Sequence, residues 1–234
     1  MSFKVPLDAR QEVKFVTRIS NLPVVYRWLN THYAGFYNVY SDRKVNNIYF
    51  DTFNYDAYKD NLSGTSSRLK VRYRWYEGSD IDIGKGQLEA KIRRNFFGWK
   101  HIYKVHTSPF SVSDTWNDVK SKIIKQLPLK GVNLLYSNPL PVMINRYHRS
   151  YYLSMDEKVR ITIDKSQQVY DQRRSMTPNF KMVSLLPSTV VIEFKFDRSN
   201  LSVASDLIQS FPVRVSRHSK YVNAVDTIAW NYIS

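Results

Sequence analysis

The residues with the clearest chemical potential are cations spaced two positions apart. In residues 68–75, Arg68, Lys70, Arg72 and Arg74 alternate with apolar or aromatic residues. Because successive side chains of a β-strand point to opposite faces, this segment predicts a strand with cations on one face and apolar groups on the other. For a single strand, the simplest interpretation is an apolar face on the core and cations in water.

The same alternation recurs along the chain, which changes that interpretation. Polar residues at every second position, nearly all of them charged, mark four further segments: Arg10, Glu12 and Lys14; Glu89, Lys91 and Arg93; Lys158, Arg160, Thr162 and Asp164; Glu193, Lys195 and Asp197. A sheet closed into a barrel, charged inside and apolar outside under helices, accounts for all of them. Unpaired cations inside it are costly unless it holds water, counter-ions or a polyanion. A mixture of arginine forks and lysine point charges suits a linear phosphate chain better than a carboxylate substrate.

Glutamates stand beside the cations at a fixed spacing. The pattern Glu-x-Lys, which puts both side chains on one face of a strand, occurs as Glu12/Lys14, Glu89/Lys91 and Glu193/Lys195. One such pair alone is best explained as a same-face salt bridge. Several pairs beside a ladder of cations favour carboxylates that hold a Mg²⁺ or Mn²⁺ ion bridging protein and phosphate.

The same alternation predicts mainly β-strands, with helices between them. The candidate strands lie near residues 9–18, 46–51, 67–77, 86–94, 99–107, 142–153, 158–165 and 189–197. The candidate helices span 21–33 with Pro23 in the first turn, 54–62, 115–127 after a cap at Ser113 or Asp114, 200–210 and 219–232. Since no linker or low-complexity tract divides the chain, the predicted fold class is α+β, in a single domain over residues 1–234.

The composition narrows the functional classes. The chain of 234 residues is 43% hydrophobic and carries a net charge of +15, which suits a folded domain with an anionic partner. It has no cysteine, so disulfides and thiolate metal sites are excluded, and a reducing, cytoplasmic location is predicted. Nucleic acid is disfavoured as the partner, because acidic groups alternate with the cations on the strand faces instead of leaving one basic outer patch.

An ordered series of short motifs carries a family resemblance. The motifs are Arg10-x-Glu12-x-Lys14, Ile48-Tyr49-Phe50-Asp51-Thr52, Lys70-Val71-Arg72-Tyr73-Arg74, Leu88-Glu89-Ala90-Lys91, Arg146-Tyr147, residues 159–164, Ile192-Glu193-Phe194-Lys195 and Ser219-Lys220-Tyr221. In this order they resemble the vacuolar transporter chaperone (VTC) domain, a member of the triphosphate tunnel metalloenzyme superfamily, over about residues 8–230. The resemblance implies a closed antiparallel eight-stranded β-tunnel, with helices packed outside and a C-terminal helix.

The resemblance also implies a function. It is that of a polyphosphate polymerase, which transfers the γ-phosphate of ATP to a growing chain of inorganic polyphosphate with Mn²⁺ or Mg²⁺ as cofactor. The implied catalytic, phosphate-binding residues are Arg72, Arg74, Lys91, Arg146, Arg160 and Lys220. The further implied substrate contacts are Lys14, Lys70, Lys195, Arg10, Tyr147 and Ser219. Glu193 is the implied metal ligand, and Glu12 and Glu89 are weaker candidates, because either can simply orient a neighbouring cation.

One departure bears on the reaction type. Triphosphate hydrolases of the superfamily usually begin with Glu-x-Glu-x-Lys, whereas Arg10 stands at the first of these positions. A second metal is therefore less expected, which favours transfer over hydrolysis. Two alternatives stay open: a tri- or polyphosphatase of the same fold, and a non-catalytic polyphosphate-binding module. No transmembrane segment is expected, and a membrane-protein partner and the oligomeric state are left open.

Overall fold

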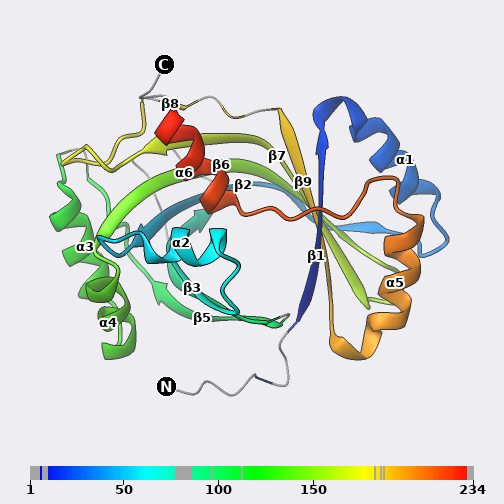
Figure 1. The fold of residues 1–234 in the computed structure, drawn as a ribbon, viewed down its shortest axis with the longest axis horizontal. Helices are drawn as coiled ribbons and strands as arrows, with labels where there is room; N and C mark the ends of the chain where they lie inside the picture. The colour runs from blue at the N-terminus through cyan, green and yellow to red at the C-terminus, as the bar shows by residue number, and fades with distance from the viewer. Residues whose placement is uncertain are drawn as a thin grey trace.

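A computed structural model describes residues 6, 10–76, 86–95, 97–111, 113–181, 183–184, 186 and 188–230. Within these residues the dominant element is one antiparallel sheet (Figure 1). Its strands are β1 (Gln11–Arg18), β2 (Tyr37–Asp51), β3 (Ser67–Tyr76), β4 (Gly86–Arg94), β5 (Phe97–Val105), β6 (Leu140–Leu153), β7 (Val159–Asp171), β8 (Val183–Ser184) and β9 (Thr189–Phe196). They are arranged in the order β1-β9-β7-β6-β2-β3-β4-β5, and β8 pairs with β7.

The sheet curves strongly, so that its two end strands approach each other (Figure 1). Between β1 and β5 the described residues form a single antiparallel bridge, from Arg10 to Gly98, and no ladder. An ion pair between Lys91 of β4 and Glu12 of β1 also spans the two ends, at 3.0 Å. The predicted α+β class is confirmed. The predicted closed tunnel of eight strands is not, because the sheet has nine strands and an open strand path.

Six α-helices lie among the described residues. They are α1 (Leu22–Thr31), α2 (Asp56–Leu62), α3 (Trp116–Ile124), α4 (Leu129–Ser137), α5 (Leu201–Ser210) and α6 (Lys220–Trp230), with short 3₁₀ turns at Ile19–Asn21 and Arg198–Asn200. Helices α1 and α5 lie at one side of the curved sheet and α3 and α4 at the opposite side, with α2 and α6 between them (Figure 1). The predicted helix 219–232 corresponds to α6, and its last two residues lie outside the described part.

Local sequence explains where two of these helices begin. In α1, Pro23 occupies the first turn, where its missing N–H costs no hydrogen bond. In α3, Thr115 accepts a hydrogen bond from the Asp118 backbone N–H, and the Asp118 carboxylate accepts one from the Thr115 backbone N–H. The cap predicted at Ser113 or Asp114 is therefore wrong, since Asp114 instead pairs with Lys122 at 2.6 Å.

Three clusters of buried apolar side chains surround the sheet. One includes Val71, Tyr73 and Trp75 of β3 with Trp116 and Val119 of α3. A second combines strand and helix residues on the α1 and α5 side, and it contains Phe15, Ile161, Ile163, Ile192, Phe194, Leu29 and Leu207. The alternating residues predicted to be apolar on β1, β3, β7 and β9 therefore pack under the outer helices, as the two-residue period requires.

The third cluster lies beneath α6. It joins Tyr221 and Ile228 of this helix to Tyr49 of β2, Met143 of β6 and Val169 of β7. The Tyr49 hydroxyl accepts a hydrogen bond from Arg72, at 3.1 Å, so this cluster borders the charged side of the sheet. Helix α6 thus covers part of the side on which the cations lie.

Candidate functional site

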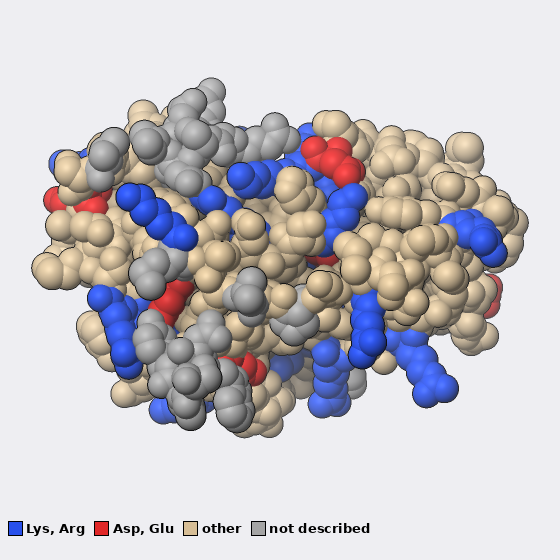
Figure 2. Space-filling model, turned by 90° about the horizontal axis from the view of Figure 1, so that it is seen from above, with Lys and Arg blue, Asp and Glu red and all other residues tan. Residues whose placement is uncertain are grey.

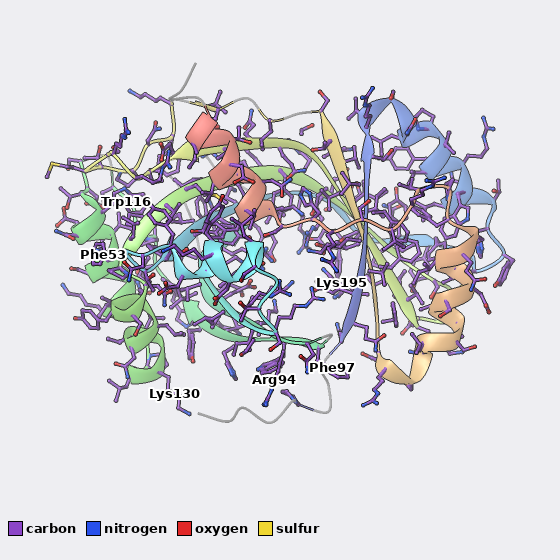
Figure 3. The ribbon with its side chains drawn as sticks, in the orientation of Figure 1. Phe53, Arg94, Phe97, Trp116, Lys130 and Lys195 are labelled. Carbon is purple, nitrogen blue, oxygen red and sulfur yellow. The ribbon has the colours of Figure 1, made fainter. Side chains whose placement is uncertain are left out.

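The charged residues of several strands face the same side of the curved sheet. We call this side the concave face, and it carries Glu12 and Lys14 of β1, Lys70, Arg72 and Arg74 of β3, Glu89 and Lys91 of β4, Arg149 of β6, Arg160 and Asp164 of β7, and Glu193 and Lys195 of β9, together with Lys220 of α6. In Figure 3, Lys195 points from β9 toward the interior of the curve. The expectation that cations from separate strands share one space is therefore met.

Glu89 is the centre of the first charged group. Its carboxylate is fully buried and is bound by Arg72, by Lys100 at 2.9 Å and by Arg74 at 3.8 Å. Burial alone would raise the pKa of the Glu89 carboxyl, but the three cations hold that pKa well below its usual range. Both of its oxygens are already occupied, since Gln87 also donates to Oε1 at 2.7 Å. Glu89 is thus placed to orient arginines.

Glu193 and Glu12 form a second group, at the junction of β1 and β9. Among the described residues, the ion pairs of the Glu193 carboxylate are with lysines, with Lys195 Nζ at 2.8 Å and Lys14 Nζ at 3.4 Å. Glu12 is bound by Lys91 and pairs across the strands with Lys195, two residues from Glu193. The charge of Glu193 acts to raise the pKa of Glu12, so the two carboxylates are near neighbours. Burial raises and the lysines lower the pKa of Glu193, with a net value well below the usual range, so it is ionised.

This second group fits the chemistry of a divalent cation. Carboxylate oxygens are the ligands that Mg²⁺ and Mn²⁺ prefer. Among the described residues no cluster of three or more histidine or acidic side chains could hold a metal ion by itself. A metal ion at Glu193 and Glu12 would therefore take its remaining ligands from phosphate oxygens and water, which is the usual arrangement for Mg²⁺ bound with phosphates.

Asp164 organises a third group and attaches α6 to the sheet. Its carboxylate is fully buried and accepts from Arg149 at 2.5 Å and from Lys220 at 2.5 Å. Both cations also lie over the Tyr147 ring, at 5.3 Å and 5.0 Å from its centroid. Because Lys220 is the first residue of α6, this ion pair positions the start of the helix against the concave face.

The structure brings Arg149 to the concave face and leaves Arg146 on the other. Arg146 donates to the Tyr170 hydroxyl at 3.4 Å and lies over the rings of Tyr170 and Phe180, which pack in the apolar cluster under α3. Sequence reasoning missed Arg149, although a signal was present. The alternation of β6 puts residues 147, 149 and 151 on one face, and Arg146, one position before Tyr147, on the other.

Cations outnumber carboxylates on the concave face, and some of them form no ion pair with another residue in the described part of the chain. Burial, followed by the repulsion of Lys14, Lys91, Arg68 and Arg72, lowers the pKa of Lys70 to about 6. Its Nζ donates to Ser219 Oγ at 3.1 Å. Arg160 Nε has no hydrogen-bond partner among the described residues. Figure 2, a view of one surface, shows more Lys and Arg than Asp and Glu. The site is thus built to receive an anion.

Two of the remaining predicted contacts lie in different places, one at the rim of the site and one buried within it. Arg10 is more than half exposed and pairs with Asp197 at 3.3 Å, which places it at the rim. Tyr147 is buried between Arg149 and Lys220. Beside Lys220, a cavity of about 250 Å³ opens between the sheet and α6, lined by Val16, Asn145, Gln167, Thr189, His218 and Asn223 among others.

Comparison with known proteins places these features in a family. A family model described as the VTC domain matches residues 9–229, which is nearly the whole chain. No curated protein sequence gives a significant match.

Solved structures show more distant likenesses. A Vibrio parahaemolyticus protein assigned as an adenylate cyclase is 11% identical, with a TM-score of 0.49 over 91% of this chain and 97% of that one. A Pyrococcus horikoshii protein is 13% identical, with a TM-score of 0.47 over 95% and 99%. An adenylyl cyclase candidate from Hippeastrum, reported with a dominant triphosphatase activity, is 14% identical, with a TM-score of 0.45 over 91% and 93%.

Proposed function

Because the chain belongs to the VTC domain family, we propose that it is a polyphosphate polymerase that acts on its concave face. The reaction moves the γ-phosphate of ATP to the end of an inorganic polyphosphate chain. The observation that carries the proposal is the meeting of cations from β1, β3, β4, β6, β7, β9 and α6 on one face. A linear polyanion is the ligand that can contact all of them at once.

The proposed step needs no covalent bond to the protein. A terminal oxygen of polyphosphate attacks the γ-phosphorus of ATP, the bond from that phosphorus to the bridging oxygen breaks, and ADP leaves with the electron pair. Arg72, Arg74 and Lys91 bind the phosphates in line, and Lys195 and Lys220 offset the charge that spreads over the transferred group. Arg149 takes the place that was first assigned to Arg146, since only Arg149 lies on this face.

A divalent cation fits beside Glu193. Mn²⁺ or Mg²⁺ would be held there, with Glu12 as the second carboxylate, and would neutralise phosphate oxygens. Glu193 is a better metal ligand than Glu89, because the present partners of Glu193 are lysines, which can move to the phosphates. Glu89 stays bound to Arg72 and Arg74 and positions them. Arg10 pairs with Asp197 at the rim. Because this position holds an arginine and not a glutamate, it supplies no carboxylate for a second metal, which favours transfer over hydrolysis.

The test is a product analysis of the purified chain with ATP and Mn²⁺. A ladder of polyphosphate on a gel, with ADP formed in equal amount, is the expected result. Release of orthophosphate without a ladder would show that the protein is instead a tri- or polyphosphatase. Unchanged ATP, with polyphosphate bound, would replace it by a binding module.

A matched pair of lysine variants ties the product to the concave face. Lys195→Ala removes a cation that contacts Glu193, whereas Lys130→Ala removes an exposed one on α4, on the outer side (Figure 3). Lys195→Ala should slow ladder formation about tenfold or more, because a charge-assisted contact to phosphate is lost. Lys130→Ala should leave the rate unchanged. Equal rates for both variants would contradict a reaction on this face.

The structure bears on the cellular setting in one respect. Within the described residues no helix is both long and apolar enough to cross a membrane. The cytoplasmic location stays a prediction from the sequence, and a membrane-protein partner stays open.

A further inference from the structure

A cluster of tyrosines lies at one margin of the concave face. Tyr40 of β2, Tyr76 of β3 and Tyr151 of β6 surround Arg43, whose guanidinium carbon is 4.8, 6.0 and 5.8 Å from the three ring centroids. The rings of Tyr40 and Tyr151 meet edge to face, with centroids 5.6 Å apart. We call Tyr40, Tyr76 and Tyr151 with Arg43 the tyrosine cluster.

A bulge in β2 brings the cluster together. Tyr40 pairs with Tyr151 and Arg43 pairs with Arg149, and the strand register shifts on both sides of Tyr40. Two positions separate the partners on β6, but three separate Tyr40 from Arg43. Residues three apart in a regular strand would face opposite sides, and the extra residue of a bulge returns them to the same side. Bulges of this kind often re-aim side chains beside active sites.

The cluster is continuous with the phosphate-binding cations. Tyr151 follows Arg149 by two residues and Tyr76 follows Arg74 by two, so each tyrosine is about 7 Å further along the same strand face. The Arg149 guanidinium carbon is 6.0 Å from the Tyr151 ring centroid. Tyr40 and Tyr151 are also among the neighbours that act on the pKa of Arg160. A ribose and base attached to a triphosphate would extend over a similar length.

Two of the three tyrosines are exposed, where core packing would bury them. Tyr40 is 48% and Tyr76 is 41% exposed. By contrast, Tyr147, which lies on the concave face of β6, is 1% exposed. An exposed ring that is held by a guanidinium on one side keeps its other surface for a flat partner. Bases stack on such aromatic rings, and arginine adds a cation–π contribution.

We propose that the tyrosine cluster binds the base of the nucleotide by stacking. This inference rests on the proposed function, because it assumes that the triphosphate of ATP lies on the concave face. Arg43 positions the rings. Since every base offers a flat surface, stacking tolerates different bases, and purine nucleotides should bind more tightly than pyrimidine nucleotides.

The experiment compares a nucleotide with its phosphates alone. Titration calorimetry, with Mg²⁺ present, measures binding of the β,γ-imido analogue of ATP and of inorganic tripolyphosphate to the whole chain. The test variant is Tyr40→Ala with Tyr76→Ala, and the conservative variant is Tyr40→Phe with Tyr76→Phe. Tyr136→Ala is the control, because Tyr136 is an exposed tyrosine of α4, on the outer side of the sheet.

The expected result is a loss of affinity only for the ligand that carries a base. The alanine variant should bind the ATP analogue about tenfold more weakly, since stacking on aromatic rings contributes this much or more per base. Its affinity for tripolyphosphate should be unchanged, and the phenylalanine variant and Tyr136→Ala should bind both ligands like the parent chain.

Three outcomes would overturn the inference, and they are distinguishable. If the alanine variant binds both ligands like the parent, the base does not stack on the cluster, while phosphate binding on the concave face stands. If the parent chain binds neither ligand, both the base site and the proposed function fail. An equal loss for both ligands would also overturn it, since the tyrosines would then support the phosphate site and not the base.

Discussion

The two faces of the sheet use the same strands for different purposes, and β9 shows this most clearly. Phe194 is fully buried and packs against the rings of Phe15, Trp28 and Phe211 under the outer helices. Its neighbours Glu193 and Lys195 point to the opposite face and pair with each other there. Because side chains alternate along a strand, three consecutive residues serve the apolar core and the charged face in turn. Substitutions on the apolar face should therefore change stability, and substitutions on the charged face should change activity.

The largest effect is expected on the apolar face. Phe194→Ala should lower the free energy of unfolding by about 4 kcal/mol, because it removes a buried ring from an aromatic group and leaves a cavity. Denaturant unfolding measures this change. Phe53→Ala is the matched control, since Phe53 is 75% exposed (Figure 3), and it should alter stability by no more than about 0.5 kcal/mol. Tripolyphosphate affinity of the folded Phe194→Ala protein should be unaltered, and a large loss of affinity would contradict the separation.

The adjacent residue tests the charged face. Glu193→Gln keeps the size of the side chain but removes the charge that would hold the divalent cation, so turnover of ATP should fall at least about 100-fold. The loss should appear in the rate at saturating ATP and Mn²⁺, while circular dichroism and the unfolding midpoint show a folded protein. If Glu193→Gln retained the parent rate, Glu193 would be only the partner of Lys14 and Lys195.

A third comparison uses one strand with two arginines on opposite faces. Arg149→Met should weaken tripolyphosphate binding about tenfold, the usual cost of losing a hydrogen bond to a charged group. Arg146→Met removes the same group on the other face, so its affinity should stay within about twofold of the parent value. Titration calorimetry measures both affinities. If Arg146→Met weakened binding more than Arg149→Met, Arg146 and not Arg149 would be the phosphate contact.

These arginines also show what the sequence could predict. Alternating charge on β1, β3, β4, β7 and β9 was enough to predict the strands and their shared face, because burial of one side enforces a strict period. The assignment of Arg146 came from a two-residue motif, and the alternation of the strand contradicts it. A motif of that length does not specify which face its residues take.

Other features were missed because they do not repeat along the sequence. The first half of β2 consists largely of exposed polar and aromatic residues, and bulges near Tyr40 disturb its alternation. Helix α4 begins after Pro128 and contains Gly131, both of which are typical of turns. Closure of the sheet depends on how its two ends meet, and among the described residues they meet at one backbone bridge, from Arg10 to Gly98, and at the ion pair of Lys91 with Glu12. Contacts between ends so far apart in the sequence leave no local pattern.

The smallest predicted effect concerns a proton on the charged face. In the free protein, burial and the surrounding cations lower the pKa of Lys70 to about 6, so its amine is mostly neutral at neutral pH. A bound polyanion favours the charged amine and raises that pKa, so binding should take up as much as one proton. Affinity for polyphosphate should therefore increase as pH falls from 8 toward about 6.

Calorimetry in buffers of different ionisation enthalpy measures this proton directly. Lys70→Met keeps an unbranched side chain, one atom shorter, that cannot titrate, so proton uptake should disappear and the affinity should depend less on pH. His218 is the main competing group, because burial and then the nearby lysines Lys220 and Lys14 lower its pKa to about 4, and a polyanion would raise it also. His218→Gln is therefore the control. If His218→Gln abolished the proton uptake and Lys70→Met did not, the titrating group would be His218. The excess positive charge near Lys70 would then already be balanced in the free protein.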